Sequence, residues 1–315
     1  MKRIDYIDAA KGGGILLIVL GHIVPEIFTY CPIIYCFWLP LFFVLSGIVY
    51  NPIDKKRFIY KKLFSLLLPF IGWYFISYLI IGIVRLIRRS INLTEFLLSF
   101  LDVLQTNDIY NIPLWFLLCL FWMNILFLLI NKTNLVVQSI YVITLAIVGS
   151  FIPNVLYIGS ALSCSPFFFV GILLGKVIPK LSNNYDTIII LTSVLVGVIC
   201  VFLNGTPPRL IYYSNSIASG NLLLIYVCGI SLVISIVFIF KRLKPSKTLL
   251  WLGKNSLIIL VTHCLFAPFV GTVVIKFIKD GGVSHLAIFI ITMSLMFLII
   301  PFCKRFLPFI VAIKK

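Results

Sequence analysis

A succession of apolar runs, each long enough to cross a lipid bilayer, dominates this sequence, and short charged segments join the runs. A transmembrane helix needs roughly 20 apolar residues and satisfies its own backbone hydrogen bonds inside the hydrocarbon layer. The runs that meet this requirement are residues 12–30, 33–50, 66–84, 112–130, 135–152, 161–178, 187–203, 221–240, 255–275 and 285–302. We therefore predict an all-α, polytopic integral membrane protein with about ten transmembrane helices, in which residues 1–315 form a single transmembrane domain.

The composition supports a membrane environment, because 62 % of the residues are apolar and 11 % are charged, whereas soluble domains carry about 25 % charge. A net charge of +17 could indicate binding to nucleic acid. The Lys and Arg residues lie in the short loops between apolar runs, however, so we interpret the charge as membrane topology and expect no nucleic-acid partner. Frequent Ile, Lys, Asn and Phe favour a bacterial source, and hence the inner (plasma) membrane.

The distribution of cations predicts the orientation of the chain. If the N-terminus is cytoplasmic, twenty of the 26 Lys and Arg residues fall in cytoplasmic segments. The six that fall outside are Arg85, Arg88, Arg89, Arg209, Lys276 and Lys279. Because cytoplasmic loops are enriched in Lys and Arg, this asymmetry predicts an even number of spans with both termini in the cytoplasm.

Two external segments are longer than a turn and are candidates for contact with an external substrate. Residues 85–111 include a stretch that predicts a short interfacial helix capped by Thr94. Residues 204–220 are rich in Gly, Pro, Ser and Asn, which predicts an ordered loop with several turns.

Cysteines and glycines in this chain indicate packing. The eight cysteines are scattered without C-x-x-C pairs, so we predict small buried hydrophobes, with Cys31 and Cys36 as the one pair spaced for a disulfide. No cluster has metal-ligand spacing, and we expect no metal. The run of residues 12–14 is not a phosphate loop, because no strand precedes it. Gly171 and Gly175 form a G-x-x-x-G pattern that predicts helix packing.

Ionisable groups inside a bilayer are costly unless they face a bundle interior or water, so each one is a candidate for function. Of the nine acidic residues only Glu26 falls within a predicted span. Of the three histidines, His22 and His263 lie well inside spans and His285 lies at the outer edge of the last one.

His22 is the strongest single candidate for catalysis. It lies about ten residues past the cytoplasmic start of its helix, which places it roughly 15 Å deep, near the middle of the membrane. An imidazole there can take a proton from a hydroxyl near neutral pH. Glu26, four residues on, shares its helical face and could orient it unless Pro25 breaks the register. A structural histidine bonded between helices is the alternative, and the spacing leaves both open.

Other candidates have a stronger structural alternative. His263 has the sequence context of a packing or hydrogen-bonding histidine. Lys11 is eleven residues before His22, so it lies on the same helix face at the cytoplasmic mouth, where a cation could bind the phosphates of a nucleotide-type donor. The cations of residues 55–62, which include Lys61 and Lys62, lie on the same side. Anchoring to anionic lipid explains most of these cations equally well.

Several segments together resemble the acyltransferase-3 family of membrane O-acyltransferases, in family order and over nearly the whole chain. They are residues 3–12, His22, and residues 37–47, 113–117, 166–171 and 253–263. The later segments are similar to the branch that includes fucose 4-O-acetylase-like proteins and capsular or exopolysaccharide O-acetyltransferases.

The resemblance implies transfer of an acyl group, usually acetyl from cytoplasmic acetyl-CoA, to a hydroxyl of a cell-surface sugar or polysaccharide. It implies that His22 is the essential histidine and that Arg3 and Asp8 are its functional partners on the cytoplasmic side. Ser46 and Gly47 match the family motif of the second span.

One segment departs from the family pattern. Many members carry an R-x-x-R pair shortly before a proline in the third span, which serves the donor, whereas the segment before Pro69 contains Lys61, Lys62 and Ser65. Lysine is a point donor and lacks the bidentate fork of arginine. The residues that bind the donor therefore differ here from the family pattern.

The resulting hypothesis is that acyl-CoA binds with its phosphates near Arg3, Lys11 and residues 55–62, and that His22 activates the acceptor hydroxyl. Direct transfer and transfer through an acetylated His22 both fit. The alternatives of other kinds are a translocator of polysaccharide or lipid-linked sugar, with His22, Glu26 and His263 on its path, and acyl transfer to a small molecule.

Overall fold

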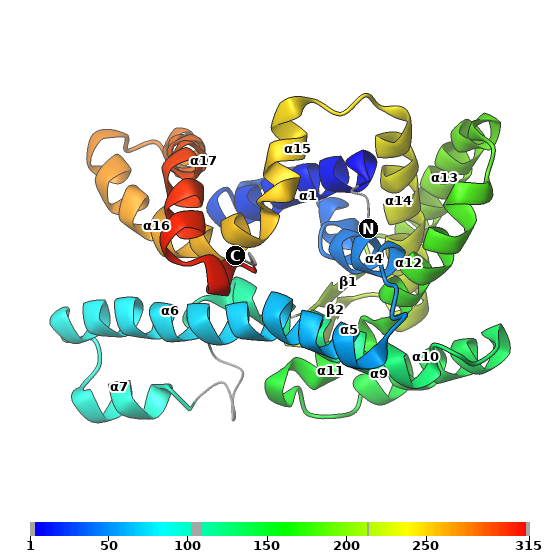
Figure 1. Ribbon diagram of the computed structural model, residues 1–315. Coiled ribbons are helices and arrows are strands. Elements are labelled where there is room, and N and C mark those ends of the chain that lie inside the picture. Colours follow the sequence, from blue (N-terminus) through cyan, green and yellow to red (C-terminus); the bar gives the residue numbers. More distant parts are fainter. Residues whose placement is uncertain (1–3, 102–108, 213, 313–315) are drawn as a thin grey trace. The chain divides into compact units, whose positions relative to one another are not determined.

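The computed structural model describes residues 4–101, 109–212 and 214–312, and its architecture is helical apart from one short β-hairpin (Figure 1). Within these residues, seven helices are long and apolar enough to cross a membrane, or eight if the bent pair Val155–Ser163 and Ser165–Lys180 is one span. Two shorter apolar helices, Ile34–Ile48 and Leu135–Gly149, fall on two further predicted runs. The prediction of an all-α, multi-pass membrane protein is thus confirmed.

The chain divides into two compact units that alternate along the sequence. The first unit contains Met1–Asn51 and Cys164–Ser256, and the second contains Pro52–Ser163 and Leu257–Lys315. Each is described by itself.

The helices of the first unit are α1 (Asp5–Ile23), α2 (Glu26–Tyr30), α3 (Ile34–Phe37), α4 (Pro40–Ile48), α12 (Ser165–Val177), α13 (Asp186–Asn204), α14 (Leu222–Arg242) and α15 (Lys247–Lys254). Figure 1 shows three close pairs, which are α1 with α15, α4 with α12, and α13 with α14.

Glycines allow α1 to approach three other helices. A Cβ on Gly12 would collide with the backbone of Leu249 in α15, one on Gly13 would meet the Phe240 ring of α14, and one on Gly14 would meet the ring of Phe42 in α4. The run of residues 12–14 is therefore a packing element at the centre of the unit.

The predicted packing role of the G-x-x-x-G pattern in α12 is also confirmed. Gly171 lies against the backbone of Val44, and Gly175 lies against that of Ile48, both in α4. Gly47 of α4 lies in turn against the Phe168 carbonyl. Small residues on both helices bring the two backbones together, as is usual in membrane interiors.

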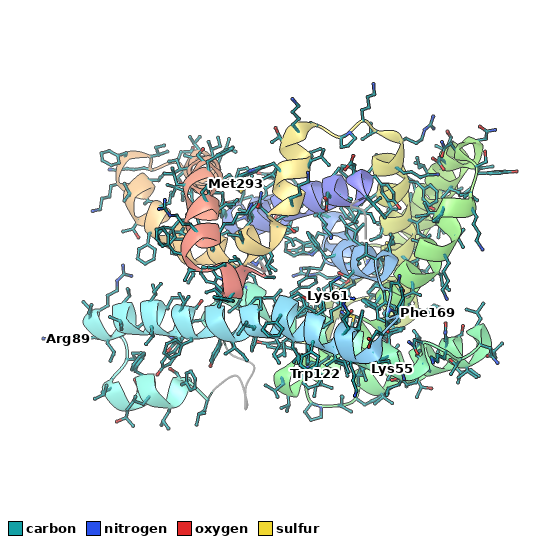
Figure 2. All side chains as sticks on the ribbon, in the orientation of Figure 1. Lys55, Lys61, Arg89, Trp122, Phe169 and Met293 are labelled. Carbon is teal, nitrogen blue, oxygen red and sulfur yellow. The ribbon has the colours of Figure 1, made fainter. Side chains whose placement is uncertain are left out.

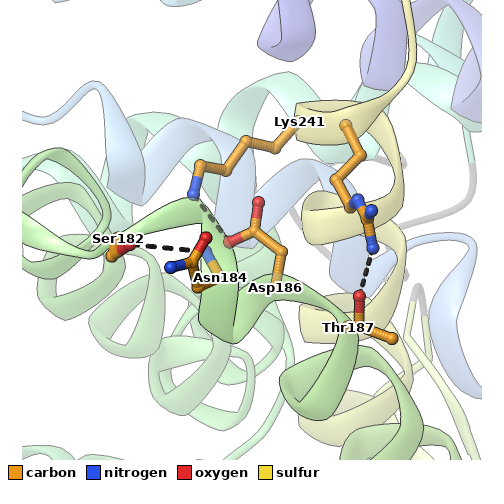
Figure 3. Close-up of polar contacts among 6 residues, drawn as sticks. Ser182, Asn184, Asp186, Thr187 and Lys241 are labelled. Atoms are coloured by element: carbon orange, nitrogen blue, oxygen red, sulfur yellow. Dashed lines mark hydrogen bonds and ion pairs between the residues drawn. The ribbon is translucent and has the colours of Figure 1, made fainter.

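A buried ion pair joins α13 to α14 (Figure 3). Lys241 Nζ lies 2.7 Å from Asp186 Oδ1, and the Asp186 side chain is 1 % exposed. Arg242 donates a second hydrogen bond to the Thr187 hydroxyl. These bonds connect the start of α13 to the end of α14.

Part of the predicted turn-rich loop, residues 204–220, is a β-hairpin. Strands β1 (Arg209–Ile211) and β2 (Ser216–Ser219) pair antiparallel, with Leu210 opposite Ile217. Leu210 and Tyr212 are buried, and burial raises the pKa of the Tyr212 hydroxyl well above its ordinary value.

The eight cysteines are free thiols in the described chain, so Cys31 and Cys36 do not form a disulfide. Cys36 donates to the Pro208 carbonyl at 3.3 Å and packs in an apolar cluster with Cys200 and Cys228. The prediction of small buried hydrophobes is confirmed for most of the cysteines; Cys31 is exposed.

The helices of the second unit are α5 (Lys55–Lys62), α6 (Leu68–Ile87), α7 (Leu93–Ser99), α9 (Trp115–Ile130), α10 (Leu135–Gly149), α11 (Ile158–Ser163), α16 (Ser256–Phe277) and α17 (Gly281–Phe306). A π-helical turn, Leu63–Leu67, joins α5 to α6 into one long rod. Figure 2 shows Lys55 and Lys61 near one end of this rod and Arg89 at the other, so cations mark both ends of its apolar stretch.

Hydrogen bonds attach α6 to its neighbours. Trp73 Nε1 donates to the Ile310 carbonyl at 3.0 Å. The buried amide of Asn111 donates to Ser77 Oγ at 3.0 Å and to the Val261 carbonyl in α16 at 2.8 Å. Such bonds satisfy polar groups that the hydrocarbon layer cannot.

The predicted short helix in residues 85–111 is confirmed as α7, but its predicted cap is wrong. Asn92 is the N-cap, and it forms a capping box with Glu95. Thr94 lies one residue inside the helix. The hydroxyls of Tyr74 and Tyr78 fasten this segment to α6 by donating to the carbonyls of Phe100 and Phe96.

Candidate functional site

Three of the predicted site residues, Asp8, Lys11 and His22, lie on the single helix α1. Asp8 is in the first turn, where a carboxylate is favoured by the helix dipole. Lys11 and His22 are separated by eleven residues, about three turns or roughly 16 Å along the axis. The helix therefore joins a charged end to a histidine end.

Asp8 is buried, with 9 % of its surface exposed. Its Oδ2 atom has no hydrogen-bond partner among the described residues. An orphaned carboxylate oxygen in a buried position calls for a partner, since nearly all buried polar atoms have one. Arg3, predicted as the partner of Asp8, lies outside the described residues.

The position of Asp8 is fixed by α15. Gly253 lies so close to the Asp8 carbonyl that any side chain at this position would collide with the α1 backbone. Gly253 is the first residue of segment 253–263, one of the segments that resemble the family. Its lack of a side chain allows α15 to pack directly on the first turn of α1.

His22 occupies the last turn of α1, and its side chain is exposed. Its Nδ1 atom lies 2.7 Å from the Ile18 carbonyl oxygen. A carbonyl only accepts hydrogen bonds, so Nδ1 carries the proton and donates, and Nε2 keeps the lone pair. The local fold therefore selects the tautomer in which Nε2 is the basic nitrogen.

An aromatic ring, that of Trp38, lies beside His22. The centroid of the His22 ring lies 6.0 Å from that of Trp38, which follows α3. Trp38 packs edge-on against Phe28 at 4.7 Å, and a Cβ on the neighbouring Gly21 would touch both rings. In the sequence Trp38 is one position within the family-like segment 37–47, and nothing there predicts its approach to His22, which depends on the fold of α2 and α3.

The structure does not support a shared helical face for His22 and Glu26. α1 ends at Ile23, and Val24 leaves the helix with φ −119° and ψ 72°. Glu26 begins the separate helix α2, for which Pro25 is the N-cap. Proline restricts the residue before it to extended conformations, which explains why the helix stops here.

Ser46, a predicted donor-binding residue from the family motif of the second span, and the lysines Lys61 and Lys62 lie in different places. Ser46 is half-buried in α4 of the first unit. Lys61 and Lys62 lie at the end of α5 in the second unit, with Lys61 exposed and Lys62 Nζ 5.1 Å from the centre of the Phe58 ring.

The π-helical turn Leu63–Leu67 directly follows these lysines. π-Helical turns are rare in proteins, and many of those that occur lie at functional sites. Sequence reasoning missed this feature, because no residue pattern distinguishes it from ordinary α-helix.

His263 is completely buried in α16. Its Nδ1 lies 2.8 Å from the Ile259 carbonyl, and its Nε2 lies 3.2 Å from Cys264 Sγ. These contacts support the interpretation of His263 as a hydrogen-bonding histidine. His285 lies half-buried in the first turns of α17.

These features describe a multi-pass membrane protein with a histidine poised for acid–base chemistry at one end of a long helix. Residues 4–304 match the model of the acyltransferase-3 family, described as an acyltransferase domain, so the chain belongs to this family and is an O-acyltransferase. No curated protein and no solved structure is significantly similar to it.

Proposed function

We propose that this O-acyltransferase moves an acetyl group from cytoplasmic acetyl-CoA to a hydroxyl of a cell-surface sugar or polysaccharide. The observation that supports this most directly is the contact of His22 Nδ1 with the Ile18 carbonyl, which leaves Nε2 as a base. Within the family we favour the branch of fucose 4-O-acetylase-like and capsular O-acetyltransferases, in a bacterial inner membrane.

The chemistry assigned to His22 is general-base catalysis. Its Nε2 takes the proton of the acceptor hydroxyl while the hydroxyl oxygen attacks the thioester carbonyl. The C–S bond then breaks, and the CoA thiolate regains a proton from the imidazolium, so charge and protons balance. In the ping-pong variant, Nε2 attacks the thioester carbonyl first, the C–S bond breaks, and the CoA thiolate takes a proton from the acetylated ring. The acceptor hydroxyl then displaces the acetyl group from Nε2, and its proton returns to the ring.

The donor-side roles follow from charge and position. Arg3, Lys11, Lys61 and Lys62 supply cations for the donor phosphates, and Ser46 lies on the donor path. The orphaned Oδ2 of Asp8 is suited to hold Arg3 in place by an ion pair. Glu26 acts on the acceptor side by orienting polar groups near His22.

The topology proposed with this mechanism has ten spans. The two shorter apolar helices, Ile34–Ile48 and Leu135–Gly149, complete the set, both termini are cytoplasmic, and the two compact units form one transmembrane domain. The start of α1 then faces the donor, and His22 is reached by the acceptor from the other side.

The test is release of free CoA from acetyl-CoA by the purified protein in lipid nanodiscs, with and without a bacterial surface-polysaccharide extract. Acceptor-dependent release should fall by at least about a hundredfold in His22→Ala and His22→Gln. His285→Ala, a histidine change at the edge of α17, is the matched control and should retain full activity. Acceptor-dependent release that persists in both His22 variants contradicts the assignment.

The same assay separates the competing functions. A translocator of lipid-linked sugar consumes no thioester, so a folded protein that releases no CoA with any acceptor favours sugar flux instead. Transfer to a small molecule would appear as CoA release with amino acids or lipid headgroups and none with polysaccharide.

A further inference from the structure

A groove of about 410 Å³ opens in the first unit between the segment around α2 and the β-hairpin. It begins beyond the end of α1 that carries His22. Its walls include Phe28 and Tyr35 on one side and Thr206, Arg209 and Ser219 on the other. The established family assignment gives this groove no role.

Arg209 is the cation of the groove, and aromatic rings hold it in place. Its guanidinium carbon lies 3.6 Å from the centre of the Tyr35 ring. Phe28 stacks on the same ring with centroids 4.0 Å apart and planes 15° apart, so the two neighbours occupy opposite faces of Tyr35. A stacked guanidinium keeps its in-plane N–H groups free to donate.

Those N–H groups have no partner among residues 4–101, 109–212 and 214–312. No side-chain hydrogen bond or ion pair joins the Arg209 guanidinium to another group in the part of the chain that the structure describes. A half-buried, preorganised arginine with free donors is suited to bind a carboxylate or phosphate bidentately.

The wall of the groove that carries Arg209 also has hydroxyls in fixed positions. Thr206 Oγ1 and Ser219 Oγ lie 2.8 Å apart, and the Asn204 amide donates to Ser219 Oγ at 3.0 Å. This network ties the hairpin to the end of α13. Fixed hydroxyls beside a cation suit a ligand that has both hydroxyls and an anionic group.

The groove is connected to His22 through shared side chains. Phe28 lines the groove, packs against Gly21, and touches Trp38, which lies beside His22. A ligand held in the groove therefore rests against Phe28, and Phe28 packs on the Trp38 ring that lies beside the histidine.

We propose that this groove is the acceptor subsite of the enzyme and that it selects a sugar with an acidic substituent, a carboxylate or a phosphate ester, through Arg209. The proposal rests on the function proposed above and adds the class of acceptor to it. A neutral sugar stacked on Tyr35 fits less well, because Arg209 and Phe28 already cover both faces of that ring.

The test measures binding to the full-length protein in nanodiscs by calorimetry. The probes are an oligogalacturonide, the same oligosaccharide with its carboxylates reduced to alcohols, and a mannose oligosaccharide with and without a phosphate ester. The acidic form of each pair should bind about ten- to a hundredfold more tightly than its neutral form, as expected for a hydrogen bond to a charged group.

Arg209→Gln should reduce binding of the acidic form to the level of the neutral form and leave the neutral form unchanged. Arg209→Lys, which keeps the charge and loses the fork, should retain part of the preference. Lys276→Gln, which removes a cation from α16, is the control and should change nothing. Melting temperatures of all variants establish that they are folded.

Equal binding of acidic and neutral probes, an equal loss for both in Arg209→Gln, or no binding of any probe would overturn the proposal. A preference for only one of the two acids would assign that acid. CoA release with neutral and acidic acceptors alike would refute the acidic class while the acetyltransferase function stands. No CoA release with any acceptor would refute the acetyltransferase function itself. The binding data would still decide whether the groove prefers acidic sugars.

Discussion

Replacing Gly253 with alanine tests whether close packing of α15 on α1 positions the reacting groups. The added Cβ would lie closer than 3.0 Å to the Asp8 backbone, which real Cβ atoms essentially never show. Neither neighbour is a flexible side chain that can move aside, because the obstacle is the carbonyl of α1 itself. The two helices must therefore separate or α1 must tilt.

The expected magnitudes follow from the geometry. Inserting a methyl group into a well-packed contact typically costs about 1–3 kcal/mol of stability. A displacement of about 1 Å of catalytic groups can cost about a hundredfold in rate. Asp8 and His22 share the rigid helix α1, so a shift at the first turn also moves the imidazole.

The assay compares thermal unfolding and acceptor-dependent CoA release for the native protein and Gly253→Ala in nanodiscs. We expect a lower melting temperature and a loss of activity of at least about tenfold at temperatures where the variant is folded. Gly281→Ala is the control, because a Cβ there meets nothing within 4 Å. A Gly253→Ala protein that melts and turns over like Gly281→Ala would refute the reasoning.

Three further changes have expected outcomes in thermal unfolding. Lys241→Met leaves the buried Asp186 carboxylate without its counter-ion and should lower the free energy of unfolding by about 3–5 kcal/mol. Asn111→Leu strands two hydrogen-bond partners and should cost about 1–3 kcal/mol. Burial raises the pKa of Tyr212, so with rising pH this hydroxyl ionises in the unfolded chain before it ionises in the folded one. The free energy of unfolding should therefore be constant below about pH 10 and fall above it. Tyr212→Phe should reduce that fall.

Each change has its own control. Lys247→Met alters an exposed lysine and should have little effect on stability. Adding Asp186→Leu to Lys241→Met removes the unpaired carboxylate and should recover stability. A Lys241→Met protein that is as stable as Lys247→Met, and that gains nothing from Asp186→Leu, would contradict the ion-pair argument. An Asn111→Leu protein as stable as the native chain would show that these bonds contribute nothing. An unchanged alkaline slope in Tyr212→Phe would assign the pH dependence to other groups.

The helical class was predictable because apolar runs must be helical in lipid. The glycine seam of α4 and α12 was predictable from Gly171 and Gly175, since small residues at four-residue spacing need a close neighbour. The cap of α7 was predictable in principle. Asn92 and Glu95 have the spacing of a capping box, whereas the sequence analysis assigned the cap to Thr94.

Other features depend on contacts between distant segments. The approach of Trp38 to His22 requires the turn that Pro25 starts, and the sequence analysis left the effect of that proline open. The hairpin around Arg209 has too short an alternation of apolar and polar residues to predict strands. The tautomer of His22 depends on the hydrogen bond from Nδ1 to the Ile18 carbonyl, one turn earlier. Any helix offers such a carbonyl, but the side-chain rotamer of His22 decides whether the bond forms.

The alternation of the two units along the chain has a consequence for biogenesis. Gly12 of α1 packs directly against the backbone of α15, and Gly12 precedes Leu249 by 237 residues. At about 5–20 residues per second of synthesis, α1 waits on the order of 10–50 s in the membrane before its partner leaves the ribosome. During this interval the glycine face of α1 (residues 12–14) and the Asp8 carboxylate lack the neighbours that cover them in the folded protein. We therefore expect α1 to be held by insertion chaperones until α15 arrives.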